Sequence, residues 1–200
     1  FFVYENNITV LDIPFLNTQI DLGKWIIPFS MLVFLATCNG VNLTDGLDGL
    51  SGGTSLICLA ALTVMIYFKY KTFDMSGNTF LAEEHLNLLY LSVSGAGAMM
   101  GYLCFNRYPA KIIMGDTGAL ALGGLIASLA IFSGYSLFIP LLGIMFVISA
   151  VSVIVQVFYF QVFNKRVILM APFHHHLQQK GYHEVVITTA YVTVTLIISM

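Results

Sequence analysis

The chain has 200 residues, of which 58% are hydrophobic and 9% are charged, and its formal net charge at pH 7 is −2. Soluble domains carry roughly a quarter charged residues, so this composition excludes an ordinary soluble domain. A mean hydropathy of +0.87 indicates a membrane protein instead. We expect no nucleic-acid partner. The three cysteines have neither metal-binding nor redox spacing and are expected to serve packing.

The chain opens with a segment, residues 1–24, that we expect outside the membrane. Its alternating pattern around Asn6 and Asn7, followed by Pro14 and Gly23, predicts a small exterior hairpin. The sequence starts at Phe1, without an initiator methionine or a basic signal-peptide region, so we interpret it as part of a longer chain.

Apolar runs dominate the remainder and predict an all-α, polytopic transmembrane helix bundle that forms a single domain over residues 1–200. A membrane-spanning helix needs about 20 mostly apolar residues. Five runs have about this length, and a sixth, which stops at the last residue, is expected to be a truncated span. The six runs cover residues 25–43, 50–68, 86–105, 119–138, 140–163 and 185–200.

Six crossings place three connecting loops, residues 39–50, 105–118 and 164–184, on the same side of the membrane. These loops carry five lysines and arginines, against three in the segments on the other side. Cytoplasmic loops of membrane proteins are enriched in these residues, so we expect the three loops to be cytoplasmic. The basic residues concerned are Arg107, Lys111, Lys165, Arg166 and Lys180.

The loop at residues 39–50 is the most polar stretch of the chain, with Asn39, Asn42, Asp45 and Asp48. One interpretation is helix capping, in which Thr44 or Asp45 caps the second helix and Asp48 lies in its first turn. In that case the two aspartates would share a helix face. Capping needs only one such residue, so we interpret the loop as one that holds a polar ligand.

The loop at residues 105–118 contributes Asn106, Lys111 and Asp116. Asp116 could cap the span that starts near Ala119, or it could be an oxygen ligand. Mg²⁺ typically takes one or two protein carboxylates and fills its other positions with water and phosphate oxygens. Because the other two polar loops lie on the same side of the membrane, we favour the interpretation of Asp116 as an oxygen ligand.

The third loop contains consecutive histidines, His174, His175 and His176, which cannot all face one way on a helix and are therefore expected in a bent loop. They lack zinc-site spacing. Donors to phosphate oxygens, or a proton donor near neutral pH, suit them better. Gln156 shares a helical face with Ser149 and Ser152, which either lines a functional cavity or makes hydrogen bonds between helices.

Acidic groups for a divalent metal and imidazoles for phosphates, gathered at one membrane face, favour phosphoryl transfer between a soluble donor and a lipid. The rival from another class is a transporter. Transporters place their polar substrate site within the membrane, near its midplane. Here the polar residues concentrate in the loops, and the spans contain no charge pair.

The loop sequences "NGVNLTDGLDGL", "FNRYPAKIIMGDTGALALGG" and "PFHHHLQQKGYHE" resemble those of the phospho-N-acetylmuramoyl-pentapeptide transferases of bacteria. This family belongs to the polyprenyl-phosphate N-acetylhexosamine-1-phosphate transferases. The wider superfamily shares the two-aspartate loop and the Gly-Asp motif, whereas the first and third sequences quoted point to the muramoyl branch. Another sugar-1-phosphate transferase of the superfamily is the alternative within the same class.

The resemblance implies a Mg²⁺-dependent transfer of phospho-MurNAc-pentapeptide from UDP-MurNAc-pentapeptide to undecaprenyl phosphate, in the bacterial inner membrane. Asp116 matches the family's magnesium ligand, with Asn42 close to the metal. Asp45 and Asp48 match residues of the nucleotide pocket, and the three histidines match a loop at the donor phosphates. Asn39 and Lys111 join the predicted substrate-binding residues, as do Asn106 and Gln156. Whether the protein forms a homodimer stays open.

The sequence departs from the family pattern in two ways. The D-D-x-x-K motif of an earlier cytoplasmic loop, which the family uses to activate the lipid phosphate, does not occur in these 200 residues. We therefore expect this chain by itself to be inactive. Ile113 stands where the family commonly has an aromatic residue that can stack on uracil, which puts that contact in doubt.

Overall fold

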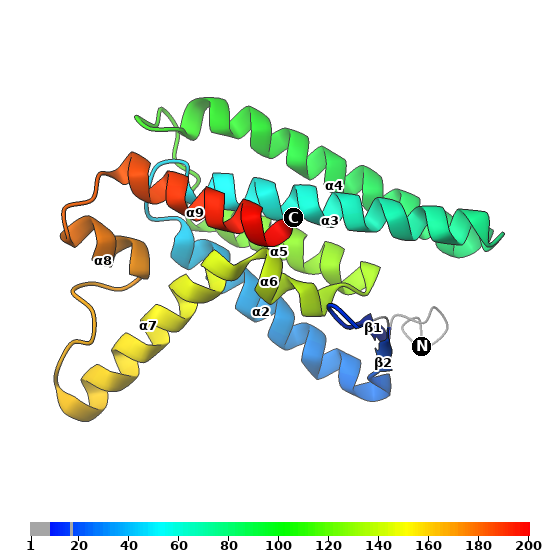
Figure 1. Cartoon of the computed structure of the whole chain (residues 1–200), viewed down its shortest axis with the longest axis horizontal. Helices are drawn as coiled ribbons and strands as arrows, with labels where there is room; N and C mark the ends of the chain where they lie inside the picture. Colours follow the sequence, from blue (N-terminus) through cyan, green and yellow to red (C-terminus); the bar gives the residue numbers. More distant parts are fainter. Residues whose placement is uncertain (1–8, 17) are drawn as a thin grey trace.

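The computed structural model describes residues 9–16 and 18–200, and over these residues the fold is a bundle of helices with one small β-hairpin (Figure 1). This confirms the predicted all-α architecture. In chain order the elements are β1 (Val10–Asp12), β2 (Gln19–Asp21), η1 (Gly23–Trp25), α2 (Ile26–Thr44), α3 (Leu50–Met75), α4 (Thr79–Asn106), α5 (Gly115–Ser133), η2 (Ser136–Phe138), α6 (Ile139–Leu142), α7 (Ile144–Phe163), α8 (Phe173–Gln179) and α9 (Glu184–Ser199).

Five of these helices, α2, α3, α4, α5 and α7, are long and apolar enough to cross a membrane. The sixth predicted span corresponds to α9, which is apolar but has only 16 residues. The apolar runs therefore predicted the order of the helices, and five of the six predicted spans have the length of a membrane crossing. A short 3₁₀ turn and the four-residue α6 lie between α5 and α7, where the apolar runs 119–138 and 140–163 predicted two spans that nearly adjoin.

The predicted hairpin is present, but its turn lies further along the chain than expected. Strands β1 and β2 pair in antiparallel fashion, with Leu11 opposite Ile20. The chain turns at Pro14 and Phe15 between the two strands, and proline fixes a backbone angle that suits a turn. The expected position at Asn6 and Asn7 lies outside the described residues.

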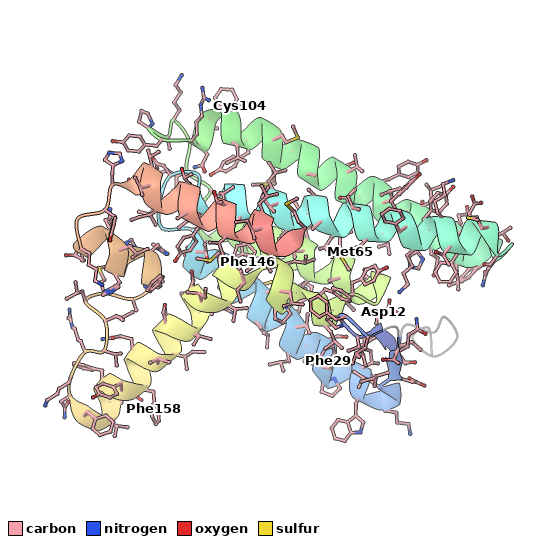
Figure 2. The ribbon with its side chains drawn as sticks, viewed as in Figure 1. Asp12, Phe29, Met65, Cys104, Phe146 and Phe158 are labelled. Atoms are coloured by element: carbon pink, nitrogen blue, oxygen red, sulfur yellow. The ribbon has the colours of Figure 1, made fainter. Side chains whose placement is uncertain are left out.

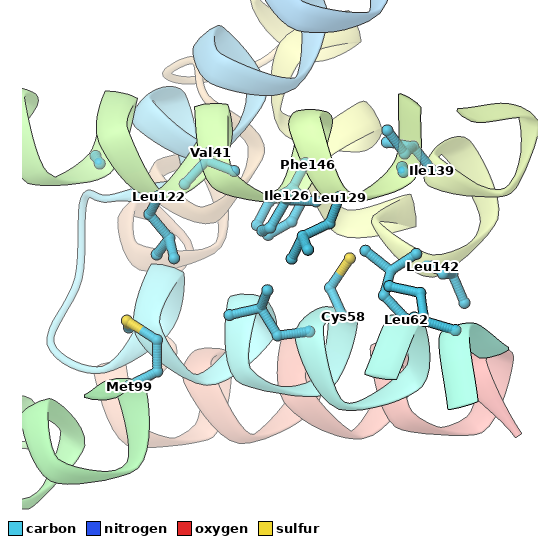
Figure 3. Close-up of a cluster of buried hydrophobic side chains, with 14 residues drawn as sticks. Val41, Cys58, Leu62, Met99, Leu122, Ile126, Leu129, Ile139, Leu142 and Phe146 are labelled. Atoms are coloured by element: carbon cyan, nitrogen blue, oxygen red, sulfur yellow. The ribbon is translucent and has the colours of Figure 1, made fainter. Parts of the chain in front are cut away.

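The core lies around α3, which packs between α4, α5 and α9 (Figure 3). Leu59, Leu62 and Ile66 on this helix are fully buried. Close packing elsewhere depends on small residues: a methyl group added at Gly123 of α5 would lie 2.6 Å from Cys38 Cα of α2. Small residues let membrane helices approach each other, so Gly123 fixes the crossing of α2 and α5.

Helix α7 diverges from the bundle, and its far half contacts few other elements in Figure 1. Phe158 projects outward there and is 64% exposed (Figure 2). In a lipid bilayer such apolar side chains face hydrocarbon, so their exposure agrees with a membrane protein. The segment after α7 returns toward the bundle and forms α8.

Several predicted boundaries are wrong. Asn39 and Asn42 belong to the last turns of α2 rather than to a loop. Helix α3 starts at Leu50, because the preceding Gly49 has a left-handed backbone with φ of 72°, which is not helical. Asp45 and Asp48 therefore lie before this helix and do not share one of its faces. The histidines lie on the short helix α8, not in a bent loop.

Candidate functional site

Three connecting segments meet at one end of the bundle, which we call the loop end: residues 45–49, 107–114 and 164–183. Figure 1 shows them together at the left of the molecule, with the start of α9 among them, while the β-hairpin lies at the opposite end. A hydrogen bond connects residues 45–49 with residues 107–114, and His174 of the third segment packs against Gly46 of the first. The predicted gathering of the polar loops at one end is therefore present in the structure.

Asn42 and Asp116 form the first contact of the site. The Asn42 side-chain nitrogen donates a hydrogen bond to Asp116 Oδ1 at 3.1 Å, across α2 and α5. Asp116 lies in the first turn of α5, where the helix dipole favours a negative charge. It is not the N-cap, since that position is Met114 and carries no side-chain bond. Asp116 remains exposed and available to a ligand.

Asp45 lies half-buried just after α2, close enough to Asp116 for the two charges to interact. Burial, and after it the negative charge of Asp116, raises the pKa of the Asp45 carboxyl. Among the described residues neither carboxylate has a lysine or arginine within ion-pair distance. A divalent cation would offset this repulsion, so the residues fit Mg²⁺.

The described part of the chain contains no cluster of three or more histidine, cysteine or acidic side chains that could hold a metal. This does not conflict with a magnesium site. Mg²⁺ keeps several waters and is usually bound through one or two carboxylates together with substrate phosphates. Asp45 and Asp116 supply that number of carboxylates.

Asp48 connects the loop end rather than projecting freely from it. One oxygen of its carboxylate, Oδ2, accepts a hydrogen bond from the backbone nitrogen of Ala110 at 2.8 Å. Its own backbone nitrogen donates to Glu184 Oε1 at 2.6 Å, and its carbonyl accepts from the Thr188 hydroxyl at 3.2 Å. Asp48 therefore joins residues 45–49 to residues 107–114 and to α9.

Asn106 is buried and uses both ends of its amide within the protein. Its oxygen accepts from the backbone nitrogen of Gly49 at 3.0 Å, and its nitrogen donates to the carbonyl of Ile112 at 2.9 Å. Lys111, in the same segment, is exposed. Asn106 thus holds two loops together, while the Lys111 ammonium group remains accessible to an anionic ligand.

The rings of His174 and His175 on α8 pack against each other, with their centroids 4.4 Å apart, and both lie near Gly46. His174 is fully buried against Gly46, where an added methyl group would clash with His174 Nε2. Burial, and to a lesser extent His175, lowers the pKa of His174 to about 4, so its ring is neutral at pH 7. Neither of its ring nitrogens has a hydrogen-bond partner among the described residues.

His175 and His176 are half-buried and less enclosed than His174. His175 Nδ1 lies 3.1 Å from Gln178 Oε1 on the next turn of α8. His176 Nδ1 accepts from the backbone nitrogen of Leu169 at 3.2 Å, which attaches α8 to the segment before it. Each ring therefore has one nitrogen engaged and keeps Nε2 for a ligand.

Asn39 and Gln156 do not lie among the residues of the site. The exposed Asn39 donates to the Leu35 carbonyl of its own helix at 2.7 Å. Gln156 Oε1 accepts from the backbone nitrogens of Val167 and Ile168, both at 3.1 Å, and so holds the segment after α7.

Of the two alternatives for the polar face of α7, hydrogen bonding between segments is observed, since the Ser152 hydroxyl accepts from Phe173 N at 3.0 Å. Ser152 and Gln156 also line an apolar cavity of about 330 Å³ beside α7.

Sequence reasoning missed Glu184 and Thr188. Glu184 stands in the first turn of α9, where an acidic residue ordinarily complements the helix dipole, so its sequence position carried no functional signal. Thr188 lies in an apolar run. Their contact with Asp48 joins positions 136 and 140 residues apart and emerges only from the tertiary structure.

A second cavity, of about 700 Å³, opens between α3, α4 and α9 next to the loop end. Asp48 and Arg107 line it, and apolar side chains form most of its wall. Those side chains include Leu56, Met100, Leu103, Val185 and Val192. The cavity therefore joins a charged rim at the loops to apolar surface at membrane depth.

The fold and the site together define a polytopic membrane protein with acidic and imidazole groups gathered at one end, a set suited to a phosphorylated substrate. A family model described as Glycosyl transferase family 4 matches residues 1–134. The chain belongs to glycosyl transferase family 4.

Curated relatives narrow the similarity further. The chain is 43% identical over 199 residues to a phospho-N-acetylmuramoyl-pentapeptide-transferase of Thermoanaerobacter sp. (strain X514), covering 98% of this chain and 58% of the relative. Proteins of the same name from Clostridium botulinum (strain Eklund 17B / Type B) and Clostridium perfringens (strain 13 / Type A) are 40% and 39% identical, covering 99% and 98% of this chain and 57% of each relative. The chain thus spans a little over half the length of these relatives, and the resemblance seen in its loops is confirmed.

Proposed function

We propose that the whole protein transfers phospho-MurNAc-pentapeptide from UDP-MurNAc-pentapeptide to undecaprenyl phosphate, giving lipid I and UMP for peptidoglycan synthesis. The observation that carries this proposal is the hydrogen bond from Asn42 to Asp116 at the loop end, with the half-buried Asp45 close enough for its charge to interact with Asp116. The names of the relatives support the same reaction. Another polyprenyl-phosphate sugar-1-phosphate transferase remains the alternative within the class.

In the proposed reaction an oxygen of the lipid phosphate attacks the phosphorus that carries the sugar. The bond from that phosphorus to the bridging oxygen breaks, and UMP leaves with the electron pair. Mg²⁺, when bound, would neutralise charge on the diphosphate as it develops. Asp116 would hold the metal, with the Asn42 amide next to it.

The other residues of the site orient and bind. The hydrogen bond from Asn42 fixes the Asp116 carboxylate in one orientation. Lys111 and His176 can donate hydrogen bonds to phosphate oxygens, because Lys111 is exposed and His176 accepts through Nδ1, which leaves the proton on its free Nε2. Asp48 and Asn106 hold the loops together, which keeps the donor pocket in shape.

The lipid acceptor has an apolar route to this end of the molecule. The 700 Å³ cavity reaches Asp48 and Arg107 from the surface of the apolar helices α3, α4 and α9, so a polyprenyl chain could lie there with its phosphate near the loops. We place the protein in the bacterial inner membrane with the loop end in the cytoplasm, where the nucleotide donor is dissolved. The excess of basic residues in the loops supports this orientation.

The experiment that tests the proposal is UMP exchange by the full-length protein. Purified enzyme, lipid I, Mg²⁺ and labelled UMP should yield labelled UDP-MurNAc-pentapeptide, because transfer between similar phosphoanhydrides is readily reversible. Chelation of Mg²⁺ should stop the exchange, and the 200-residue chain alone should show none. Absence of exchange, combined with movement of a solute across vesicles, would favour a transporter instead.

A further inference from the structure

Two side chains of α9 form hydrogen bonds with the backbone of one loop residue, Asp48. Glu184 and Thr188 are four positions apart and so lie on one face of the helix. Glu184 Oε1 accepts from Asp48 N at 2.6 Å, and the Thr188 hydroxyl donates to Asp48 O at 3.2 Å. Both backbone polar groups of Asp48 are therefore bonded to the same helix.

The other side of the loop is held from a different direction. Asp48 Oδ2 accepts from Ala110 N at 2.8 Å, and Gly49 N donates to the buried Asn106 oxygen at 3.0 Å. Residues 48 and 49 are thus fixed between α9 on one side and the segment after α4 on the other. The short segment between α2 and α3 has no regular structure of its own that could replace these bonds.

This segment needs such support because it contains Gly46 and Gly49, which leave the backbone many accessible conformations. Asp45 lies three residues before the anchored Asp48. A change in the loop would move its carboxylate relative to Asp116. Displacements of about 1 Å in a site can lower a rate by about 100-fold.

We propose that Glu184 and Thr188 are positioning residues that hold residues 45–49 and so keep Asp45 near Asp116. The inference rests on the function proposed above for the same site. Glu184 acts through its oxygen as a hydrogen-bond acceptor for Asp48 N. The competing explanation is that Glu184 only complements the dipole of α9 by its charge.

The Glu184→Gln and Glu184→Ala variants separate these roles in the full-length protein. Glutamine keeps an acceptor oxygen and loses the charge, whereas alanine loses both. Thr188→Val removes only the hydroxyl, and Glu83→Ala, at an exposed position near the start of α4, is the matched control. Hydrogen exchange of the peptide that contains Asp48, the apparent Mg²⁺ affinity from thermal shifts, and kcat for transfer are measured for each.

We expect Glu184→Ala to accelerate exchange at Asp48 by about tenfold or more and to lower kcat and Mg²⁺ affinity by about 10- to 100-fold, as is typical when the partner of a site residue is removed. Thr188→Val should have the same effects to a smaller degree. Glu184→Gln should stay within about threefold of the wild type, and the Glu83 variant should be unchanged.

Equal losses in the Gln and Ala variants would overturn the proposal, because they would assign the effect to charge. Unchanged exchange at Asp48 in Glu184→Ala, or fast exchange with normal kcat and normal Mg²⁺ affinity, would overturn it as well. A wild type that binds Mg²⁺ but transfers no sugar phosphate would refute the proposed reaction. In that case the exchange and affinity data would still support the positioning role.

Discussion

The two ends of the bundle differ in whether their charged side chains have partners of opposite charge. At the hairpin end, the Lys69 ammonium group of α3 lies 2.5 Å from Asp12 of β1 and also donates to the Ser133 carbonyl at 2.7 Å. The Gln19 amide donates to the second oxygen of Asp12 at 2.8 Å. Every oxygen of this carboxylate therefore has a partner, and the contacts attach the hairpin to α3 and α5.

At the loop end, Asp45 and Asp116 lie close enough for their like charges to interact, and the buried His174 ring has no hydrogen-bond partner among the described residues. The ion pairs found in residues 9–16 and 18–200, Lys69–Asp12 and Lys71–Asp74, both lie at the other end. Partnered charges stabilise a fold, whereas like charges kept together usually mark a place where a ligand completes the site. The comparison supports a structural role for the hairpin end and the proposed catalytic role for the loop end.

The largest effect should come from Asp116→Asn in the full-length protein. The change removes one of two carboxylates available to Mg²⁺ and keeps the shape of the side chain. We expect transfer to fall by about 10²- to 10³-fold, with membrane insertion and unfolding temperature nearly unchanged. UMP exchange over a Mg²⁺ titration measures it. Near-normal turnover at limiting Mg²⁺ would contradict the role of Asp116 as a metal ligand.

An intermediate effect concerns His174 and pH. The pKa of His174 in the folded protein is about 4, against an ordinary value of 6.5. Below pH 6.5 the unfolded chain therefore binds a proton at His174 that the folded chain does not bind. The contribution of His174 to stability should therefore be nearly constant above pH 6.5 and fall by about 2 kcal/mol by pH 5.

Apparent unfolding free energies in detergent at pH 5 and pH 7 test this expectation. His174→Gln should remove most of the difference between the two pH values. The exposed His183, which caps α9 through Nδ1, supplies the control, since His183→Asn keeps a capping group and should keep the pH dependence. An unaltered pH dependence in His174→Gln would show that another group is responsible.

The smallest effect is expected at the hairpin end. Lys69→Met removes the cation from a pair whose side chains are 17% and 23% exposed, and should lower stability by about 1 kcal/mol, between the values for solvated and buried pairs. Transfer at saturating substrate should remain normal. The exposed Lys71–Asp74 pair is the control, and Lys71→Met should change stability by less than about 0.5 kcal/mol. A loss of turnover in Lys69→Met would end the division between the two ends.

The sequence by itself determined the membrane bundle, the order of its long helices, the presence of a hairpin and the placement of three polar loops at one end. These features depend on signals along the sequence. The lengths of the apolar runs define the spans, and two spans between successive loops return the chain to the same side of the membrane. The motifs around Asp45, Asp116 and His174 also carried the family resemblance.

Only the tertiary structure decided where the helices end and which polar groups meet. Asn42 looks like a loop residue in the sequence, yet it completes α2, because backbone hydrogen bonds continue through polar residues at a helix end. Asp48 and Gln156 resemble ligand-binding residues in the sequence, but in each a side-chain oxygen accepts a hydrogen bond from a backbone nitrogen of another segment. Glu184 resembles a helix-dipole residue and bonds Asp48, 136 positions away. Such contacts depend on how remote segments pack, and no local pattern of residues encodes that packing.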